Sequence, residues 1–331
     1  MASGAFPPVA LTCGDPAGIG PEISLLAWQR LGATLPFFWI GDPAHLPEGA
    51  AVRIISAPDE AIGAVAAGLP VLPHAFGAPV IPGRPSPDNA RGVVEVIERA
   101  VELVRNGEAS AICTAPIAKK ELVDHAGFGF PGHTEFLAHL AGADRVVMML
   151  AAAELKVVPA TIHIPLAEVA TALTPDVLEA AIEITAAALK TDFGIAAPRI
   201  AVAGLNPHAG EAGLLGREEI DWIAGLCDRL RARGLDLIGP LPADTMFHAA
   251  ARSGYDAAIA MYHDQALIPI KTLAFERGVN VTLGLPFVRT SPDHGTAFDI
   301  AGRGLADPTS LIEALKLAEA MARTRAGQKG S

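Results

Sequence analysis

The stretch Asn280–Pro308, NVTLGLPFVRTSPDHGTAFDIAGRGLADP, decides the fold of this chain. It opens as a short β-branched strand and then breaks at Gly284 and Pro286. From there to Gly304 it carries charged or titratable side chains among glycines and prolines, including Arg289, Asp293, His294 and Asp299. A polar, turn-rich segment of this length inside an apolar chain predicts a binding loop rather than a plain connection.

Outward from this stretch, apolar runs of strand length alternate with longer amphipathic segments. The runs are almost continuously apolar, as expected for strands that are covered on both faces. The predicted strands are Val9–Cys13, Phe37–Ile40, Val52–Ile55, Ala111–Thr114, Val146–Ala151, Val157–Ile162, Ile200–Ala203, Ala257–Met261 and Val279–Leu283. The predicted helices are Pro21–Gln29, Ala90–Arg105, Thr174–Lys190, Glu218–Arg233 and Pro308–Ala326. This alternation predicts a doubly wound α/β sheet.

Composition excludes several classes of protein. A chain of 331 residues with 51% apolar and 5% aromatic residues can build a large core from Ala, Val, Leu and Ile. The net charge of −11 argues against nucleic acid as a partner. The longest uncharged run, residues 61–83, is interrupted by four prolines and cannot span a membrane. Three cysteines without CxxC spacing predict free thiols and a cytoplasmic protein, with Cys13 and Cys113 as small buried hydrophobes.

Polar turns follow five of the predicted strands, where open α/β sheets bind their ligands. They are GDPAGIGPE (14–22), TAPIAKK (114–120), His163, NPHAGE (206–211) and YHDQ (262–265). The first turn could hold a phosphate at the start of the following helix. It could equally be a tight turn in which Asp15 caps the helix and Pro21 begins it, and no GxGxxG fingerprint is present.

Ten histidines are present, and three of them lie just past strands, at positions 163, 208 and 263. Three neutral imidazoles that leave one coordination position open are typical of a catalytic metal site. Asp264 could orient His263. Their separations match no local zinc motif, so a structural role for each stays open. The remaining histidines are expected at the surface or in the core, at 45, 74, 125, 139 and 248, or belong to motifs described next, at 133 and 294.

His133 and Thr134 stand at the start of a predicted helix in FPGHTEFLAHLAG (130–142). Backbone N–H groups at such a start favour an anion, and both side chains can donate hydrogen bonds. A plain N-cap role for Thr134 is an equal alternative.

The run HGTAFDIAG (294–302) resembles the HG(S/T)AxDIAGxGxANP signature of the β-decarboxylating dehydrogenases. The longer run LGLPFVRTSPDHGTA resembles the 4-hydroxythreonine-4-phosphate dehydrogenase family more closely, as do GHTE, IHIPL, NPHAGE and MYHDQ. The resemblance extends over most of the chain, from Val9 to Pro308.

This resemblance implies a two-domain α/β/α fold of the isocitrate/isopropylmalate dehydrogenase type, with the active site in the interdomain cleft. The first domain would comprise residues 1–130 and 300–331, and the second residues 131–299. It implies a homodimer whose divalent metal ion (Zn, Mg or Co) is bound by His163, His208 and His263 from both subunits. It further implies substrate-binding residues at His133, Thr134, Lys271, Asn280 and Arg289, and a nicotinamide cofactor, NAD or NADP, at His294, Gly295 and Asp299.

The implied activity is oxidation of 4-phosphooxy-L-threonine with decarboxylation to 3-amino-2-oxopropyl phosphate, a precursor of pyridoxal phosphate. A cation at the alcohol oxygen lowers the pKa of that alcohol. Lys271 or Asp244 is the candidate for proton transfer, although Asp244 could instead cap a helix. Three alternatives remain: a dehydrogenase of phosphorylated threonate or erythronate, a metal-dependent acyl or phosphoryl transferase on a similar scaffold, and a non-catalytic sugar-phosphate sensor.

Overall fold

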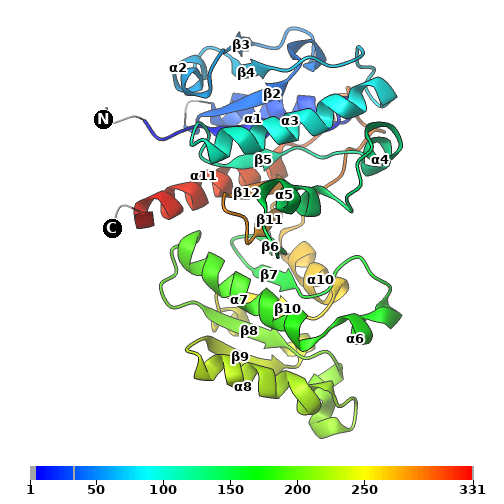
Figure 1. The fold of residues 1–331 in the computed structure, drawn as a ribbon, viewed down its shortest axis with the longest axis vertical. Helices are drawn as coiled ribbons and strands as arrows, with labels where there is room; N and C mark the ends of the chain where they lie inside the picture. Colours follow the sequence, from blue (N-terminus) through cyan, green and yellow to red (C-terminus); the bar gives the residue numbers. More distant parts are fainter. Residues whose placement is uncertain (1–4, 33, 330–331) are drawn as a thin grey trace. The chain divides into compact units, whose positions relative to one another are not determined.

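The computed structural model describes residues 5–32 and 34–329, and its elements divide into two α/β units (Figure 1). The first unit comprises Met1–Asp144 and Leu285–Ala326, and the second comprises Arg145–Gly284 and Gly327–Ser331. A mixed α/β fold with large sheets and flanking helices was predicted and is confirmed.

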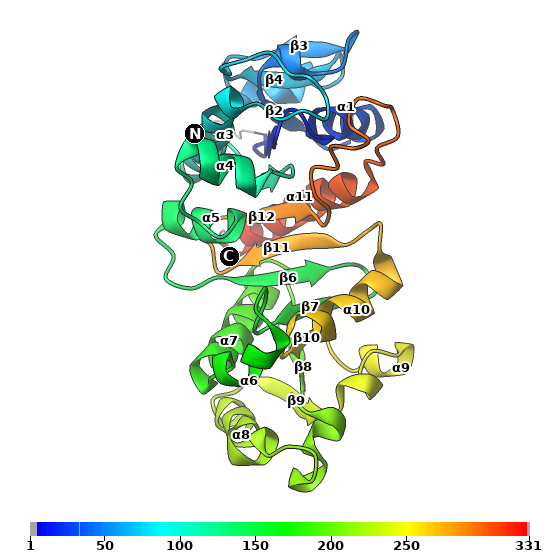
Figure 2. The same cartoon turned by 90° about the vertical axis from the view of Figure 1, so that its right-hand side faces the viewer.

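The first unit contains a sheet of parallel strands in the order β3-β4-β2-β1-β5-β12. The strands are β1 (Val9–Thr12), β2 (Phe37–Gly41), β3 (Val52–Ile54), β4 (Leu69–Pro73), β5 (Ile112–Thr114) and β12 (Arg289–Pro292). The helices are α1 (Gly20–Leu31), α2 (Ala61–Ala64), α3 (Pro87–Arg105), α4 (Lys119–Ala126), α5 (His133–Ala141) and α11 (Thr309–Lys329). Helix α3 lies on one side of this sheet, and α1 and α11 lie on the other (Figure 2).

The second unit contains a mixed sheet in the order β11-β6-β7-β10-β8-β9. Strands β11 (Val279–Leu283), β6 (Val147–Ala151) and β7 (Lys156–Pro159) pair antiparallel in turn. From β7 onward the strands are parallel: β10 (Ala257–Ala260), β8 (Arg199–Ala203) and β9 (Asp236–Leu241). The helices are α6 (Val169–Ala172), α7 (Pro175–Thr191), α8 (Ala224–Ala232), α9 (Ala249–Arg252) and α10 (His263–Ala274). Helices α7 and α8 cover one face and α10 the other (Figure 2).

The predicted helix cap of α7 and the predicted apolar strands are present in the structure. Thr174 caps α7, since its side chain accepts a hydrogen bond from the backbone N–H of Val177 at 3.3 Å, and Pro175 begins the helix. Strands β1, β2, β5 and β12 of the first unit are buried on both faces, with Phe37, Phe38 and Trp39 fully buried on β2, whereas the edge strand β3 is largely exposed. Aliphatic and small side chains supply most of the remaining core, as the composition predicts.

Cys13 and Cys113 are free and fully buried, as predicted. Burial raises the pKa of the Cys113 thiol to about 12, and it raises the pKa of Cys13 further. Both thiols therefore act as packing groups. No helix among the described residues is long and apolar enough to cross a bilayer.

Asp15 lies in the turn between β1 and α1 and does not cap that helix. Its Oδ1 accepts a hydrogen bond from the N–H of Ala17 at 3.0 Å, and the N-cap position belongs to Ile19. The side chain is buried, and the loss of solvation raises its pKa to about 6, with repulsion from Glu121 acting in the same direction. The ionised carboxylate is therefore less stable here than it is in the unfolded chain.

Because Asp15 is buried, we predict that the Asp15→Asn variant is more stable than wild type by an amount that depends on pH. Because the folded-state pKa of Asp15 lies above the ordinary aspartate pKa of 3.8, stability is lost as pH rises through the interval between the two values. Asparagine keeps the acceptor for Ala17 and removes the charge. At pH 8 we expect its free energy of unfolding to exceed that of wild type by up to about 3 kcal/mol.

The gain should shrink as pH falls from about 6 toward 4, and urea unfolding across that range measures it. The control is Asp42→Asn, which alters the same kind of turn at a more exposed carboxylate. Parallel pH profiles for wild type and Asp15→Asn would show that the Asp15 charge is not destabilising.

Candidate active site

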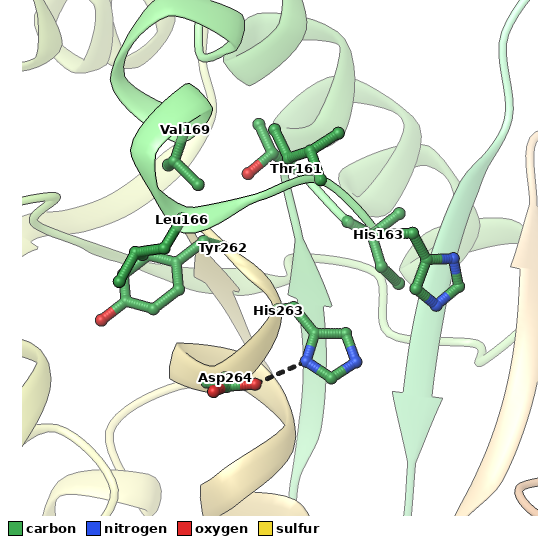
Figure 3. Close-up of a pocket in the computed structure, with 9 residues that line it drawn as sticks. Thr161, His163, Leu166, Val169, Tyr262, His263 and Asp264 are labelled. Carbon is green, nitrogen blue, oxygen red and sulfur yellow. Dashed lines mark hydrogen bonds and ion pairs between the residues drawn. The ribbon is translucent and has the colours of Figure 1, made fainter.

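His163 and His263 come together in the second unit. Their ring centroids lie 5.8 Å apart, and both side chains face the same cavity of about 330 Å³ (Figure 3). The other side chains lining it are mostly apolar: Thr161, Ile162, Ile164, Leu166, Val169 and Tyr262, with Asp264 at the polar end. Figure 3 shows Asp264 bonded to the imidazole of His263.

The parallel pairing of β7 with β10 brings these two histidines together. The pairing continues past the strand ends, because the N–H of Ala160 donates to the carbonyl of Ala260 at 2.8 Å. The Thr161 hydroxyl then donates to the carbonyl of Met261 at 2.7 Å. His163 and His263 follow directly, each two residues beyond this last contact.

The geometry of the His263 ring suits a metal ligand. Nδ1 lies 2.6 Å from Oδ1 of Asp264, so in the tautomer in which Nδ1–H donates, the lone pair of Nε2 is left for a cation. A carboxylate that orients an imidazole in this way is the usual second partner of a metal-bound histidine. The predicted orienting role of Asp264 thus has a matching contact, and the pair fits two ligands of a divalent ion.

His208 stands apart in a turn that follows β8, at Pro207–Gly213. Among the described residues, no three His, Cys, Asp or Glu side chains are placed to hold one metal ion. One copy of the chain therefore brings together two of the three predicted ligands and leaves His208 exposed elsewhere. The prediction placed the third ligand in a second subunit, and it stays a prediction.

Backbone strain is concentrated in the predicted site segments. Among the described residues, six that are not glycine have positive φ, and all six lie in these motifs. They are His163, then His208, Ala209, Glu211 and Ala212 of the NPHAGE turn, and Ala297 of the HGTAFD run. Left-handed backbone costs roughly 1–2 kcal/mol for each such residue. Strain of this kind persists where the surrounding structure enforces it, most often at functional sites.

The first unit contains a buried cation, Arg289. Arg289 was predicted in a loop, but it begins strand β12 and is buried. The loop prediction is wrong because β12 pairs parallel with β5, with Arg289 opposite Ile112. Its Nη2 donates to the hydroxyl of Thr114 at 2.6 Å. A cation fixed in this way can bind a phosphate or carboxylate.

His133 begins helix α5, and its imidazole is affected by the Arg289 charge. Desolvation lowers the pKa of His133 well below its ordinary value, and repulsion from Arg289 lowers it further. Burial likewise lowers the pKa of Arg289, to about 10. His133 is therefore neutral and Arg289 charged at neutral pH, and the buried Nε2 of His133 has no hydrogen-bond partner within the described part of the chain.

Thr134 is the second residue of α5 and does not cap it. The N-cap position belongs to Gly132, whose backbone is extended. The alternative of a plain N-cap for Thr134 is therefore wrong. The N–H groups of this first turn, together with Arg289, make an electropositive end suited to an anion.

A second cavity in the first unit, of about 410 Å³, lies between the β1–α1 turn and the end of the HGTAFDIAGRG run. Hydrogen bonds join these segments: the N–H of Ile19 donates to the carbonyl of Thr296 at 3.0 Å, and the N–H of Gly302 donates to Glu22 at 3.2 Å. A Cβ on Gly18 would lie 2.8 Å from the Thr296 carbonyl oxygen, so glycine is required there. Glycines and prolines form most of the wall: Pro16, Gly18, Pro21, Pro47, Pro82, Gly302 and Gly304.

The predicted cofactor residues lie in the same run but outside this wall. His294 is partly buried and its Nδ1 lies 3.0 Å from the carbonyl of Gly295, while Gly295 and Asp299 are exposed. His45, which carried no motif in the sequence, lines the cavity instead and is buried there. The volume of the cavity lies within the range of small-molecule sites.

The remaining predicted residues lie in the second unit. Lys271 is on α10, two turns after His263, and its Nζ is 5.5 Å from the ring centre of Phe275. Asn280 is on β11, opposite Leu150 of β6. Asp244 is exposed in a short 3-10 turn after β9, where Pro242 holds the N-cap position. The alternative role of Asp244 as a helix cap is therefore wrong.

Comparison with known proteins agrees with this set of motifs. The family described as pyridoxal phosphate biosynthetic protein PdxA matches residues 34–318. A 4-hydroxythreonine-4-phosphate dehydrogenase from Ruegeria sp. (strain TM1040) is 62% identical over 98% of this chain and 99% of its own length.

Two solved structures are also similar. The 4-hydroxythreonine-4-phosphate dehydrogenase of Klebsiella pneumoniae has a TM-score of 0.85 and 39% identity, over 96% of this chain and 99% of that one. A terephthalate 1,2-cis-dihydrodiol dehydrogenase from Burkholderia xenovorans LB400 has a TM-score of 0.66 and 30% identity, over 95% of this chain and 98% of that one. The predicted family is thus confirmed, and the chain belongs to the PdxA family of pyridoxal phosphate biosynthetic oxidoreductases.

Proposed function

We propose that this protein is a 4-hydroxythreonine-4-phosphate dehydrogenase. It would oxidise 4-phosphooxy-L-threonine with NAD, and with decarboxylation, to 3-amino-2-oxopropyl phosphate in pyridoxal 5′-phosphate biosynthesis. The name of its 62% identical relative supports this substrate. The free, buried thiols fit a reducing compartment, and we place the protein in the cytoplasm.

The observation that carries the proposal is the His163–His263 pair, 5.8 Å apart, with Asp264 orienting His263. Neutral imidazoles bind Zn²⁺ and Co²⁺ well, whereas Mg²⁺ prefers oxygen ligands. A catalytic site of this kind uses three protein ligands and one open position. We assign the third ligand to His208 of a second copy of the chain.

A second copy is favoured by the apolar surface of the second unit. Each predicted metal ligand is followed within six residues by an exposed large hydrophobic side chain: Leu166 (71% exposed), Leu214 (82%) and Ile268 (62%). Exposed apolar groups beside functional residues are typical of protein interfaces. A two-fold dimer would cover them and complete two identical metal sites.

The first unit would bind the anionic and the nucleotide ends of the ligands. We assign the substrate phosphate to Arg289, His133 and Thr134, because a buried cation and a helix start combine there. We assign the adenosine end of the cofactor to the cavity between the β1–α1 turn and Gly302–Gly304, with His294, Gly295 and Asp299 on the adjoining run.

Lys271, Asn280 and Asp244 would act on the reacting end of the substrate. When bound, the nicotinamide accepts the hydride and the divalent ion supplies Lewis acidity. Lys271 is favoured to take the alcohol proton, because it is on the same rigid helix as His263 and is partly buried. Asp244 is the alternative base, and Asn280 would position the substrate.

The reaction is tested by following absorbance of the reduced nicotinamide with purified protein, divalent metal and NAD or NADP. We expect the absorbance to rise with 4-phosphooxy-L-threonine. A rise only with phosphorylated threonate or erythronate would overturn the substrate and keep the reaction class. No rise with any of them, but release of acyl or phosphoryl groups, would favour a transferase.

Replacing residues at the two ends of the substrate should change different kinetic constants. The His133→Ala variant loses a hydrogen bond to a charged group, so we expect KM to rise roughly 10- to 100-fold. The Lys271→Met variant loses the proton acceptor, so we expect kcat to fall roughly 10²- to 10⁴-fold. His139→Ala, on the exposed side of the same helix α5, is the matched control for His133.

If KM rises equally in the His133→Ala and His139→Ala variants, His133 does not bind the substrate. If Asp244→Asn, and not Lys271→Met, lowers kcat, the base is Asp244.

The shared metal site predicts complementation between two inactive variants. His208→Ala and His263→Ala homodimers should each lack both sites. A mixed dimer should recover one site, formed by the His163–His263 pair of the first variant and the His208 of the second. Random subunit exchange makes half of the dimers mixed, so about a quarter of wild-type activity should return.

The exchange is carried out by mixing the two variants and following dehydrogenase activity with time. His248→Ala replaces an exposed histidine of the same unit and serves as the control, with full activity expected. If all three ligands came from one chain, the mixture would stay inactive, and the shared site would be wrong.

A further inference from the structure

The turn that carries His208 has an unusual backbone. Five consecutive residues have positive φ: His208 (51°), Ala209 (50°), Gly210 (79°), Glu211 (41°) and Ala212 (54°). Only one of them is glycine, so nothing intrinsic to these residues favours the left-handed conformation. Contacts from outside the turn must therefore hold it.

Two neighbouring carboxylates bind the residue that starts the turn. Glu219 is buried, and its Oε1 accepts from the backbone N–H of Asn206 at 2.8 Å while its Oε2 accepts from the Asn206 side-chain amide at 2.9 Å. Glu218 accepts from the same amide at 2.6 Å and from the N–H of Arg217 at 3.0 Å. We call Asn206 and Glu219 the clasp.

Two glycines pack so closely against the clasp that no side chain would fit at either position. A Cβ on Gly210 would lie 2.7 Å from Oε2 of Glu219, and a Cβ on Gly216 would lie 2.2 Å from Cγ of Asn206. Both glycines have positive φ. The backbone within the turn, at Gly210, and after it, at Gly216, thus packs directly against the clasp.

Gln265 connects the root of this turn to the helix of His263. Its Nε2 donates to the carbonyl of Gly204 at 2.8 Å, and its Oε1 accepts from the N–H of Met261 at 2.6 Å. Gln265 is two residues after His263 on α10, and Gly204 directly follows β8. One side-chain amide therefore links the start of the segment that leads to His208 with the segment just before His263.

We propose that Asn206, Glu219 and Gln265 are positioning residues of the metal site, which hold His208 ready to complete the site of a second subunit. This inference rests on the proposed role of His208. An exposed histidine on a relaxed loop would have to be ordered when the ion binds, at a cost in affinity. A turn that is held in place beforehand avoids that cost.

The inference is tested by Co²⁺ binding to the full-length protein, followed by visible absorbance and equilibrium dialysis. Glu219→Gln keeps the shape of the clasp but replaces one acceptor oxygen with an NH₂ group that faces a donor. We expect this variant and Asn206→Ala to bind Co²⁺ about 10- to 100-fold more weakly, as loss of an outer partner of a metal ligand usually does. Gln265→Glu replaces the donor to Gly204 with a carboxylate oxygen that faces the Gly204 carbonyl, so it should weaken binding as well.

Asp221→Asn is the matched control. Asp221 is exposed in the same segment and its carboxylate pairs with the Arg217 side chain at 2.8 Å, so Co²⁺ binding should match wild type. The melting temperature of each metal-free variant separates loss of positioning from loss of folding. If Glu219→Gln does not fold, Asn206→Ala and Gln265→Glu decide the outcome.

The His208→Ala variant distinguishes the two possible failures. If it binds Co²⁺ as wild type does, the proposed role of His208 is wrong and the inference falls with it. If it binds weakly while folded Asn206→Ala, Glu219→Gln and Gln265→Glu bind normally, the metal site stands and the positioning role is overturned.

Discussion

Parallel pairing of β10 with β7 on one side and β8 on the other is the constraint on which the proposed metal chemistry depends. Parallel strands end at the same edge of a sheet, so the segments that follow these three strands must emerge together. His163, His263 and His208 stand in those segments, although up to 100 residues separate them in the sequence. Backbone hydrogen bonding thus brings distant residues to one edge before any side chain takes part.

The edge alone does not decide which histidines meet. The β7–β10 pairing continues into the following turns through Thr161 and Met261, and this extension places His163 against His263. On the β8 side, the chain instead enters a left-handed turn held by Asn206 and Glu219. His163 and His263 lie together because strand pairing continues past β7 and β10, whereas His208 lies apart because the chain turns just after β8.

Much of this architecture could be predicted from the sequence, because buried parallel strands are continuously apolar. Every predicted strand overlaps an observed one. The observed strand β7 ends at Pro159, earlier than the predicted end at Ile162. Strand β4 was missed because it contains Pro70 and Pro73. Pairing of β4 with β2 begins at Val71, so Pro70 needs no donor toward that neighbour.

Strands β9 and β12 and helices α4 and α10 were missed as well. Strand β12 reads as a polar loop, since its buried residues include Arg289, Thr290 and Ser291 rather than aliphatic side chains. Helix α10 contains Pro269, which argues against a helix interior. The motifs could not show that His45 lines the cavity of about 410 Å³, because much of its wall comes from loops distant in the sequence.

The candidate residues of the two units differ in their electrostatic surroundings. The chain carries a net charge of −11, yet Arg289 is a buried cation with a neutral imidazole beside it. Burial strengthens the attraction of that cation for an anion, because little water screens it. In the second unit the histidines are near the surface, where an ion and another subunit can reach them.

Two imidazoles from one chain fall short of the three ligands that a catalytic site needs, so under the proposed function an isolated chain would bind its metal weakly. Assembly and catalysis would then depend on the same exposed His208.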